Sequence, residues 1–117
     1  MFTKGQKAES SVVLWLQKNN FTILEQNFRK KCGEIDIIAK KNNVIAFVEV
    51  KSRTTDYFNL SNVIVLSKQR KIIKTAQLYI AQHKFVDTIY RFDVALVLHS
   101  LNNDTIEYIP NAFTQAE

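Results

Sequence analysis

The feature of this chain that most constrains its fold is a pair of apolar, β-branched runs separated by a short polar turn. The two runs and the turn are EIDIIAK at 34–40, VIAFVEVK at 44–51 and the pair Asn42-Asn43. Asparagine tolerates the positive φ angles of a two-residue hairpin turn. This stretch therefore predicts an antiparallel β-hairpin.

The predicted hairpin brings acidic side chains together inside apolar strands. A two- or four-residue turn places Asp36 opposite Glu49 and Glu34 opposite Lys51, whereas a three-residue turn or a bulge would change this register. Facing side chains point to the same side of a sheet with Cβ atoms roughly 5 Å apart, so the carboxylates of Asp36 and Glu49 would repel each other. A proton on one carboxylate, a hydrogen-bonded pair or a bound cation could each relieve that repulsion.

The cation is the alternative that carries chemistry. Mg²⁺ accepts two carboxylates, a backbone carbonyl and waters as ligands. Lys51 follows Glu49 by two residues and points to the same side, where its ammonium group could act on a water or on a phosphate. This combination indicates phosphodiester cleavage. The plainer alternative is an Asp36 carboxylate that accepts a hydrogen bond from a neighbouring loop, an exposed edge carrying Glu49 and Lys51, and a cross-strand ion pair between Glu34 and Lys51.

The rest of the chain reads as helices and strands around this hairpin. Helical spacing of apolar residues predicts a helix over 5–19 and a second one over 67–83, with Ser67 as its cap. Trp15, Tyr79 and Phe92 are expected in the core. Further strands are expected at 21–28, 90–98 and 105–109. A turn is expected at 29–33, an irregular segment at 52–66 and a tail after Pro110. We expect a single α/β domain over 1–117, in the order helix, three strands, helix, and one or two strands.

Three polar residues within apolar patterns are further candidates for the site. Glu9 falls on the apolar stripe of the first helix, where it could be another metal or water ligand, or serve the helix dipole. Gln69 falls on the core stripe of the second helix, where it could bond a phosphate or a catalytic water, or be a plain helix-start residue. Asp93 lies in an apolar strand and is expected to support the site indirectly, or to pair with Arg91 or another basic neighbour.

The distribution of charge favours a polyanionic partner. The net charge is +5, but residues 29–74 alone hold eleven Lys or Arg and four acids, a net +7. Neutralising phosphates releases condensed counterions, so such a segment suits nucleic acid, although a solvated basic face is the alternative. The candidate nucleic-acid contacts are Arg29, Lys30, Lys31, Arg53, Lys68, Arg70 and Lys71.

Composition excludes several other classes of protein. One cysteine, Cys32, and two histidines exclude a disulfide framework and argue against an all-protein zinc site. Apolar runs such as 44–48 are too short to span a bilayer, and the first residues lack the apolar region of a secretory signal. We therefore expect a cytoplasmic protein.

The motifs also resemble a known family. The stretches GQKAE at 5–9, NFRKKCGEIDIIA at 27–39, FVEVKSR at 47–53, KQRKIIKTAQLYI at 68–80 and YRFDVALV at 90–97 are similar to the YraN-like family of small bacterial predicted endonucleases. The Asp followed by Glu-x-Lys on the next strand is similar to the PD-(D/E)XK nuclease superfamily. Ile35 stands where that motif has proline, and 54–66 lacks a glycine that the resemblance leads us to expect.

The resemblance implies both a fold and an activity. It implies a mixed β-sheet flanked by helices in αβββαβ order, and a relation to archaeal-type Holliday junction resolvases, which cleave branched DNA with Mg²⁺. It assigns metal binding to Asp36 and Glu49, catalysis to Lys51, and supporting roles to Glu9 and Gln69.

Our first functional hypothesis is a DNA endonuclease that uses Mg²⁺ or Mn²⁺, with branched or structured DNA as substrate. A homodimer would suit a symmetric junction. A noncatalytic nucleic-acid-binding module that keeps the nuclease fold is the alternative, and a protein-interaction subunit is the third.

Overall fold

A computed structural model of the chain describes residues 3–54 and 64–114. Its five-stranded sheet has the order β1-β2-β3-β4-β5. β3 and β4 are parallel and are connected through α3, while the other neighbours are antiparallel. The elements are α1 (Lys4–Lys18), β1 (Thr22–Lys30), β2 (Gly33–Lys41), β3 (Val44–Arg53), α3 (Leu66–His83), β4 (Ile89–Leu98) and β5 (Thr105–Phe113). The expected α/β class, a mixed sheet flanked by helices, is confirmed, with a second strand after α3.

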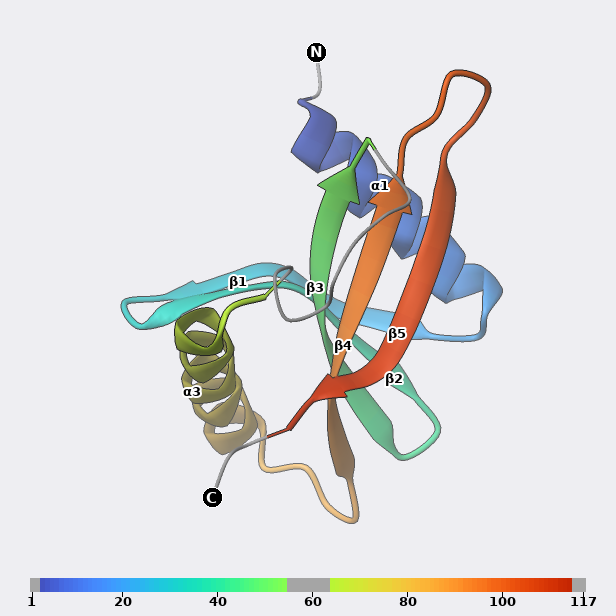
Figure 1. Cartoon of the computed structure of the whole chain (residues 1–117). Coiled ribbons are helices and arrows are strands. Elements are labelled where there is room, and N and C mark those ends of the chain that lie inside the picture. The colour runs from blue at the N-terminus through green and yellow to red at the C-terminus, as the bar shows by residue number, and fades with distance from the viewer. Residues whose placement is uncertain (1–2, 55–63, 115–117) are drawn as a thin grey trace.

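The two helices cover opposite faces of the sheet (Figure 1). Alternation along β3 sends Phe47 into the core under α3 and Val48 into the core under α1. Because both faces are covered, the central strand reads as a nearly continuous apolar run rather than an alternating one. α3 lies beside the twisted β1–β2 ribbon, whereas α1 crosses behind β3, β4 and β5 (Figure 1).

Tertiary pairing moves several predicted boundaries. The turn expected at 29–33 covers only 31–32, because β1 stays paired with β2 as far as Lys30 and Gly33. β3 runs through Arg53, into the segment expected to be irregular, because it stays paired with β4 to its end; residues 55–63 of that segment lie outside the described residues. Ser67 is not the helix cap, since α3 starts at Leu66 after Val65.

One further expectation fails at the edge strand. β5 continues through Pro110 to Phe113, because an edge strand has an outer side on which proline removes no ladder hydrogen bond. Trp15 is half-buried but packs against the core under α1, as expected, and its ring stacks on Tyr108 of this strand. Tyr79 is buried as expected and Phe92 half-buried. In the part of the chain that the structure describes, neither helix is long and apolar enough to cross a membrane.

The tip of the β1–β2 ribbon packs tightly against α3 at Gly33. A Cβ atom at this position would lie 2.8 Å from Thr75 Oγ1 and 3.1 Å from the Lys71 carbonyl oxygen. We expect Gly33→Ala to lower the free energy of unfolding by about 1–3 kcal/mol, because the ribbon or the helix must move. Urea unfolding would measure this loss.

Gly5→Ala is the matched control for that substitution. A Cβ atom at Gly5 has its nearest contact at 3.9 Å, and alanine favours the helical backbone of α1. Equal stability of the Gly33→Ala and Gly5→Ala proteins would contradict the close packing.

Candidate active site

The predicted hairpin forms in the predicted register, but its strands separate just before the acidic pair. The ladder between β2 and β3 ends where Ile37 faces Val48. At the residue before Ile37, Asp36 Oδ2 accepts a hydrogen bond of 2.8 Å from the Val50 backbone N–H. The Asp36 side chain thus satisfies a backbone donor that the ladder leaves without a strand partner.

The expectation that Glu34 faces Lys51 is wrong. β2 follows β1 rather than β3 at this end, and Glu34 lies directly opposite Arg29. Arg29 Nη2 lies 2.8 Å from Glu34 Oε2, so these two residues form the ion pair.

Glu49 is the most perturbed carboxyl group of the site. It is 5% exposed and comes from the buried stretch of β3. Burial raises its pKa to about 8, and the charge of Asp36 and a hydrogen bond between the two side chains act in the same direction. The two acids on the diverging strands therefore share one site. Ionisation of Glu49 next to Asp36 is unfavourable there unless a cation lies close by.

Two lysines supply positive charge next to this pair. Lys68 Nζ of α3 lies 3.5 Å from Glu49 Oε1, and Lys51 Nζ of β3 lies 4.0 Å from the same atom. Burial lowers the pKa of Lys51, with the neighbouring Lys68 ammonium adding to the effect. The pKa of Lys68 is raised despite its burial, because Glu49 and Asp36 stabilise its charge. The two lysines thus differ in how readily they release a proton.

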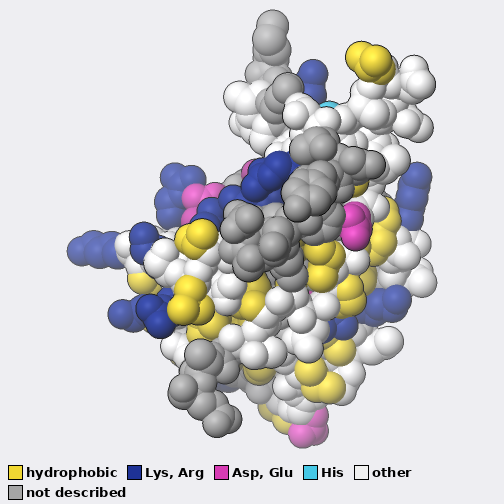
Figure 2. All heavy atoms as spheres, in the orientation of Figure 1, with side chains coloured by type: hydrophobic (Ala, Val, Ile, Leu, Met, Phe, Trp, Pro, Cys, Tyr) yellow, Lys and Arg dark blue, Asp and Glu magenta, His cyan; other side chains and the backbone are white. Residues whose placement is uncertain are grey.

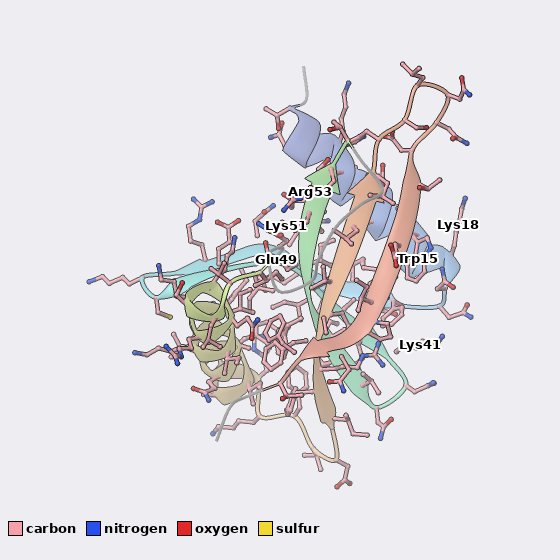
Figure 3. All side chains as sticks on the ribbon, in the orientation of Figure 1. Trp15, Lys18, Lys41, Glu49, Lys51 and Arg53 are labelled. Carbon is pink, nitrogen blue, oxygen red and sulfur yellow. The ribbon has the colours of Figure 1, made fainter. Side chains whose placement is uncertain are left out.

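Asp36, Glu49 and Lys68 line a hollow of about 380 Å³ between the β1–β2 ribbon and the start of α3. In the structure, Lys and Arg side chains gather around the ribbon tip and the first turns of α3, with acidic side chains among them (Figure 2). Glu49, Lys51 and Arg53 follow one another along the end of β3 (Figure 3). The lining residues are Gly33, Glu34, Asp36, Glu49, Ser67, Lys68, Lys71 and Ile72. The hollow is wide enough for a phosphate group and has cations at its rim.

The two helical candidates, Glu9 and Gln69, do not line this hollow. Glu9 of α1 is half-buried and lines a separate polar hollow together with Asn27 and Arg29. Burial raises the pKa of Glu9, with smaller contributions from the charges of Asp36 and Glu34. Gln69 Nε2 donates a 3.0 Å hydrogen bond to the Ile64 carbonyl oxygen and thereby holds the chain that enters α3.

The side chains predicted to contact nucleic acid differ in whether they already have a partner within the protein. The Arg29 charge is paired with Glu34, while Lys30 Nζ lies 5.2 Å from the centroid of the Phe28 ring. Arg53 Nη1 donates to the Ser52 carbonyl oxygen. Lys31, Arg70 and Lys71 are exposed, and Lys71 lines the hollow.

The sequence interpretation missed two features of the site. Lys68 was assigned only to nonspecific backbone contact, although it precedes the buried Ile72 by one helical turn, and that spacing could have placed it on the inner face. The second is a chain of polar groups that begins at Ser52, the residue after Lys51. The Ser52 hydroxyl hydrogen-bonds His99 Nε2, and His99 Nδ1 lies 3.0 Å from Asp104 Oδ1. This chain of polar groups connects the β4–β5 loop to the end of β3.

The donor set fits a hard divalent cation better than zinc. Asp36 and Glu49 are two oxygen donors, and Mg²⁺ is usually held by one or two carboxylates with waters completing its shell. Among the described residues, no group of three or more His, Cys, Asp or Glu is arranged to hold a metal ion. The structure thus does not bring Glu9 into such a group with Asp36 and Glu49.

The sequence of residues 8–97 matches the family described as "Uncharacterised protein family UPF0102". The chain belongs to the UPF0102 family. A UPF0102 protein of Geobacter metallireducens is 43% identical over 113 residues, which cover 96% of this chain and 93% of the relative. A UPF0102 protein of Clostridium acetobutylicum is 41% identical over 112 residues, which cover 93% of this chain and 92% of the relative. A UPF0102 protein of Clostridium botulinum is 46% identical over 113 residues, which cover 93% of this chain and 92% of the relative.

UPF0102 is the YraN family, so the resemblance read from the motifs is confirmed. The matched range begins in α1 and ends in β4, so it includes the two acids and the two lysines of the candidate site. β5 and the Asp104 end of the polar chain lie beyond it.

Proposed function

We propose that this UPF0102 chain is a metal-dependent endonuclease that hydrolyses phosphodiester bonds in DNA, with branched or structured DNA as its substrate. The observation that carries the proposal is the shared, surface-open site of Asp36 and Glu49, with two lysines within 4.0 Å of Glu49. A structural ion pair alone would not need two adjacent carboxyl groups, one of them with its pKa raised to about 8.

Asp36 and Glu49 would hold Mg²⁺ or Mn²⁺. When bound, such a cation stabilises negative charge on phosphate oxygens and makes nearby water more acidic. Hydrolysis then requires attack of a water oxygen on phosphorus, cleavage of the P–O bond and a proton for the leaving oxygen.

The lysines of the chain provide the remaining chemistry. Lys51 lies beside the acids, and burial lowers its pKa, so its amine can orient the water and gives up its proton more readily than an exposed lysine. Lys68 keeps its charge and can stabilise the negative phosphate oxygens. The exposed Lys31, Arg70 and Lys71 would contact the DNA backbone without reading sequence.

The proposal is tested by incubating the protein with linear, forked and four-way DNA in Mg²⁺, Mn²⁺ or EDTA. We expect cleavage that requires the metal, is fastest on branched DNA and falls by about 10²-fold or more in Asp36→Asn, since this change removes a charged ligand. Asp87→Asn is the matched control, because Asp87 is exposed in a loop and asparagine tolerates its φ of 50°.

Two outcomes would overturn the proposal in different ways. Salt-sensitive DNA binding that persists in Asp36→Asn and Glu49→Gln, without cleavage in any metal, would identify a noncatalytic binding module. Absence of DNA binding at low salt would leave a protein-interaction subunit.

A further inference from the structure

A second hollow, of about 370 Å³, lies at the opposite end of the sheet from the candidate active site. Three aromatic rings line it: Trp15 of α1, Phe21 before β1 and Tyr108 of β5. The Trp15 and Tyr108 rings are stacked, with centroids 4.6 Å apart and planes 18° from parallel. Trp15 and Lys41 lie on the side of the molecule away from Glu49 and Lys51 (Figure 3). We call this hollow the Trp15 pocket.

Two basic side chains complete the wall of the Trp15 pocket. Lys41, at the end of β2, has its Nζ 5.5 Å from the centroid of the Phe21 ring. Arg91 of β4 is held in place by Asp93, which is fully buried: Arg91 Nε and Nη2 each donate a 2.9 Å hydrogen bond to that carboxylate. The predicted pairing of Asp93 with Arg91 is therefore confirmed.

The same buried carboxylate also fixes one of the aromatic rings. The Tyr108 hydroxyl and the Asn111 backbone N–H both donate hydrogen bonds to Asp93. A buried carboxylate is costly and is retained only when its partners are well placed. This network holds a guanidinium group and a phenol ring at fixed positions in the pocket wall, which is the preorganisation that a binding site needs.

A pocket with these walls suits a flat aromatic ring joined to a negatively charged group. Nucleobases stack on aromatic side chains whatever their sequence, and lysine and arginine bind phosphate. The volume is within the range of sites for small molecules, about 300–1,000 Å³. A base paired in a duplex has both faces stacked and its edge occupied, so the ring must come from an unpaired base.

We propose that the Trp15 pocket binds a single unpaired nucleotide, with its base among the aromatic rings and its phosphate at Lys41 and Arg91. The nucleotide is either free or a unit of a single strand, since both present the same chemistry. This binding does not require cleavage at the Glu49 site.

Trp15 is the sole tryptophan of the chain, so its intrinsic fluorescence reports directly on the pocket. The protein is titrated in EDTA with dAMP, with an eight-residue single-stranded oligothymidylate and with a blunt duplex of equal length. We expect saturable quenching by dAMP or by the single strand and none by the duplex. Quenching by dAMP at least as tight as by the strand assigns a free nucleotide, and tighter binding of the strand assigns a nucleotide unit within it.

Paired lysine variants test the position of the phosphate. We expect Lys41→Gln to weaken binding roughly tenfold, as for loss of one hydrogen bond to a charged group. Lys40→Gln removes the same charge from the neighbouring residue, which does not line the pocket, and should bind as the wild type does. Absence of quenching by all three ligands, or equal weakening by both variants, would overturn the proposal.

The Lys51→Ala protein separates this proposal from the proposed nuclease function. Its substitution lies in the candidate active site, so its fluorescence titration should match the wild type even when cleavage is lost. Loss of quenching in Lys51→Ala would also count against a separate pocket.

Discussion

Replacing Lys51 with alanine should lower the rate of DNA cleavage by about 10²–10⁴-fold, the range for loss of a positioned proton donor or acceptor. The ammonium group lies 4.0 Å from Glu49, which places it beside the expected metal ligands. Burial lowers its pKa, so it gives up its proton more readily than an exposed lysine. The measurement is single-turnover cleavage of the best DNA substrate at saturating Mg²⁺.

Two further variants define what Lys51 does. Lys51→Arg keeps the charge but cannot give up its proton, so retained activity would indicate charge stabilisation and lost activity would indicate proton exchange. Lys7→Ala is the matched control, because it removes one exposed lysine in a helix that favours alanine. Wild-type rates in Lys51→Ala, with normal thermal unfolding, would exclude this lysine from the reaction.

Replacing Glu49 with glutamine should stabilise the metal-free protein at alkaline pH. Burial and Asp36 raise the pKa of Glu49 to about 8, whereas the unfolded chain has the ordinary value of 4.5. Between these two values the folded protein keeps a proton that the unfolded chain has released. The free energy of unfolding of the wild type therefore falls as pH rises from about 5 to about 8, by roughly 2–5 kcal/mol in total.

Glutamine does not titrate, so this loss should be absent in Glu49→Gln. The measurement is urea unfolding in EDTA at pH 5, 7 and 9 for the wild type and for Glu49→Gln. The difference between the two proteins isolates Glu49 from other groups, such as Glu9, that titrate in both.

A divalent cation provides the converse test. Mg²⁺ or Mn²⁺ should raise the Tm of the wild type more at pH 8 than at pH 6, because fewer protons compete for the carboxylates. Glu49→Gln should lose most of this increase, and Glu107→Gln, which changes an exposed residue of β5, should keep it. An identical pH dependence in the wild type and in Glu49→Gln would contradict the shared carboxyl site.

The hairpin register was predictable because it depends on local features. Asn42 has a φ of 56°, which is the turn geometry expected from asparagine, and the alternation of the flanking strands leaves one register that buries their apolar residues. The pairing of Asp36 with Glu49 followed from that register. The separation of the two strands at residues 33–36 was not predictable from the register, because there β2 pairs with β1 and no longer with β3.

The roles of Lys68 and Trp15 were not predictable in the same way. Lys68 meets Glu49 only because the crossover between two parallel strands returns α3 over the end of β3. Trp15 lines a pocket as well as packing against the core, because β5 brings Tyr108 against it. Both contacts join segments more than fifteen residues apart, and no spacing in the chain encodes such a distance.

Local patterns of side chains were thus enough to establish the succession of helices and strands, the hairpin and its pair of acids, because turn preference and alternation act over a few residues. The meeting of those acids with Lys68, the Arg29–Glu34 pair and the buried Asp93 network depended on how separate elements pack. Such contacts are selected by the total burial and twist of the whole sheet, which are properties of the folded molecule rather than of any one segment.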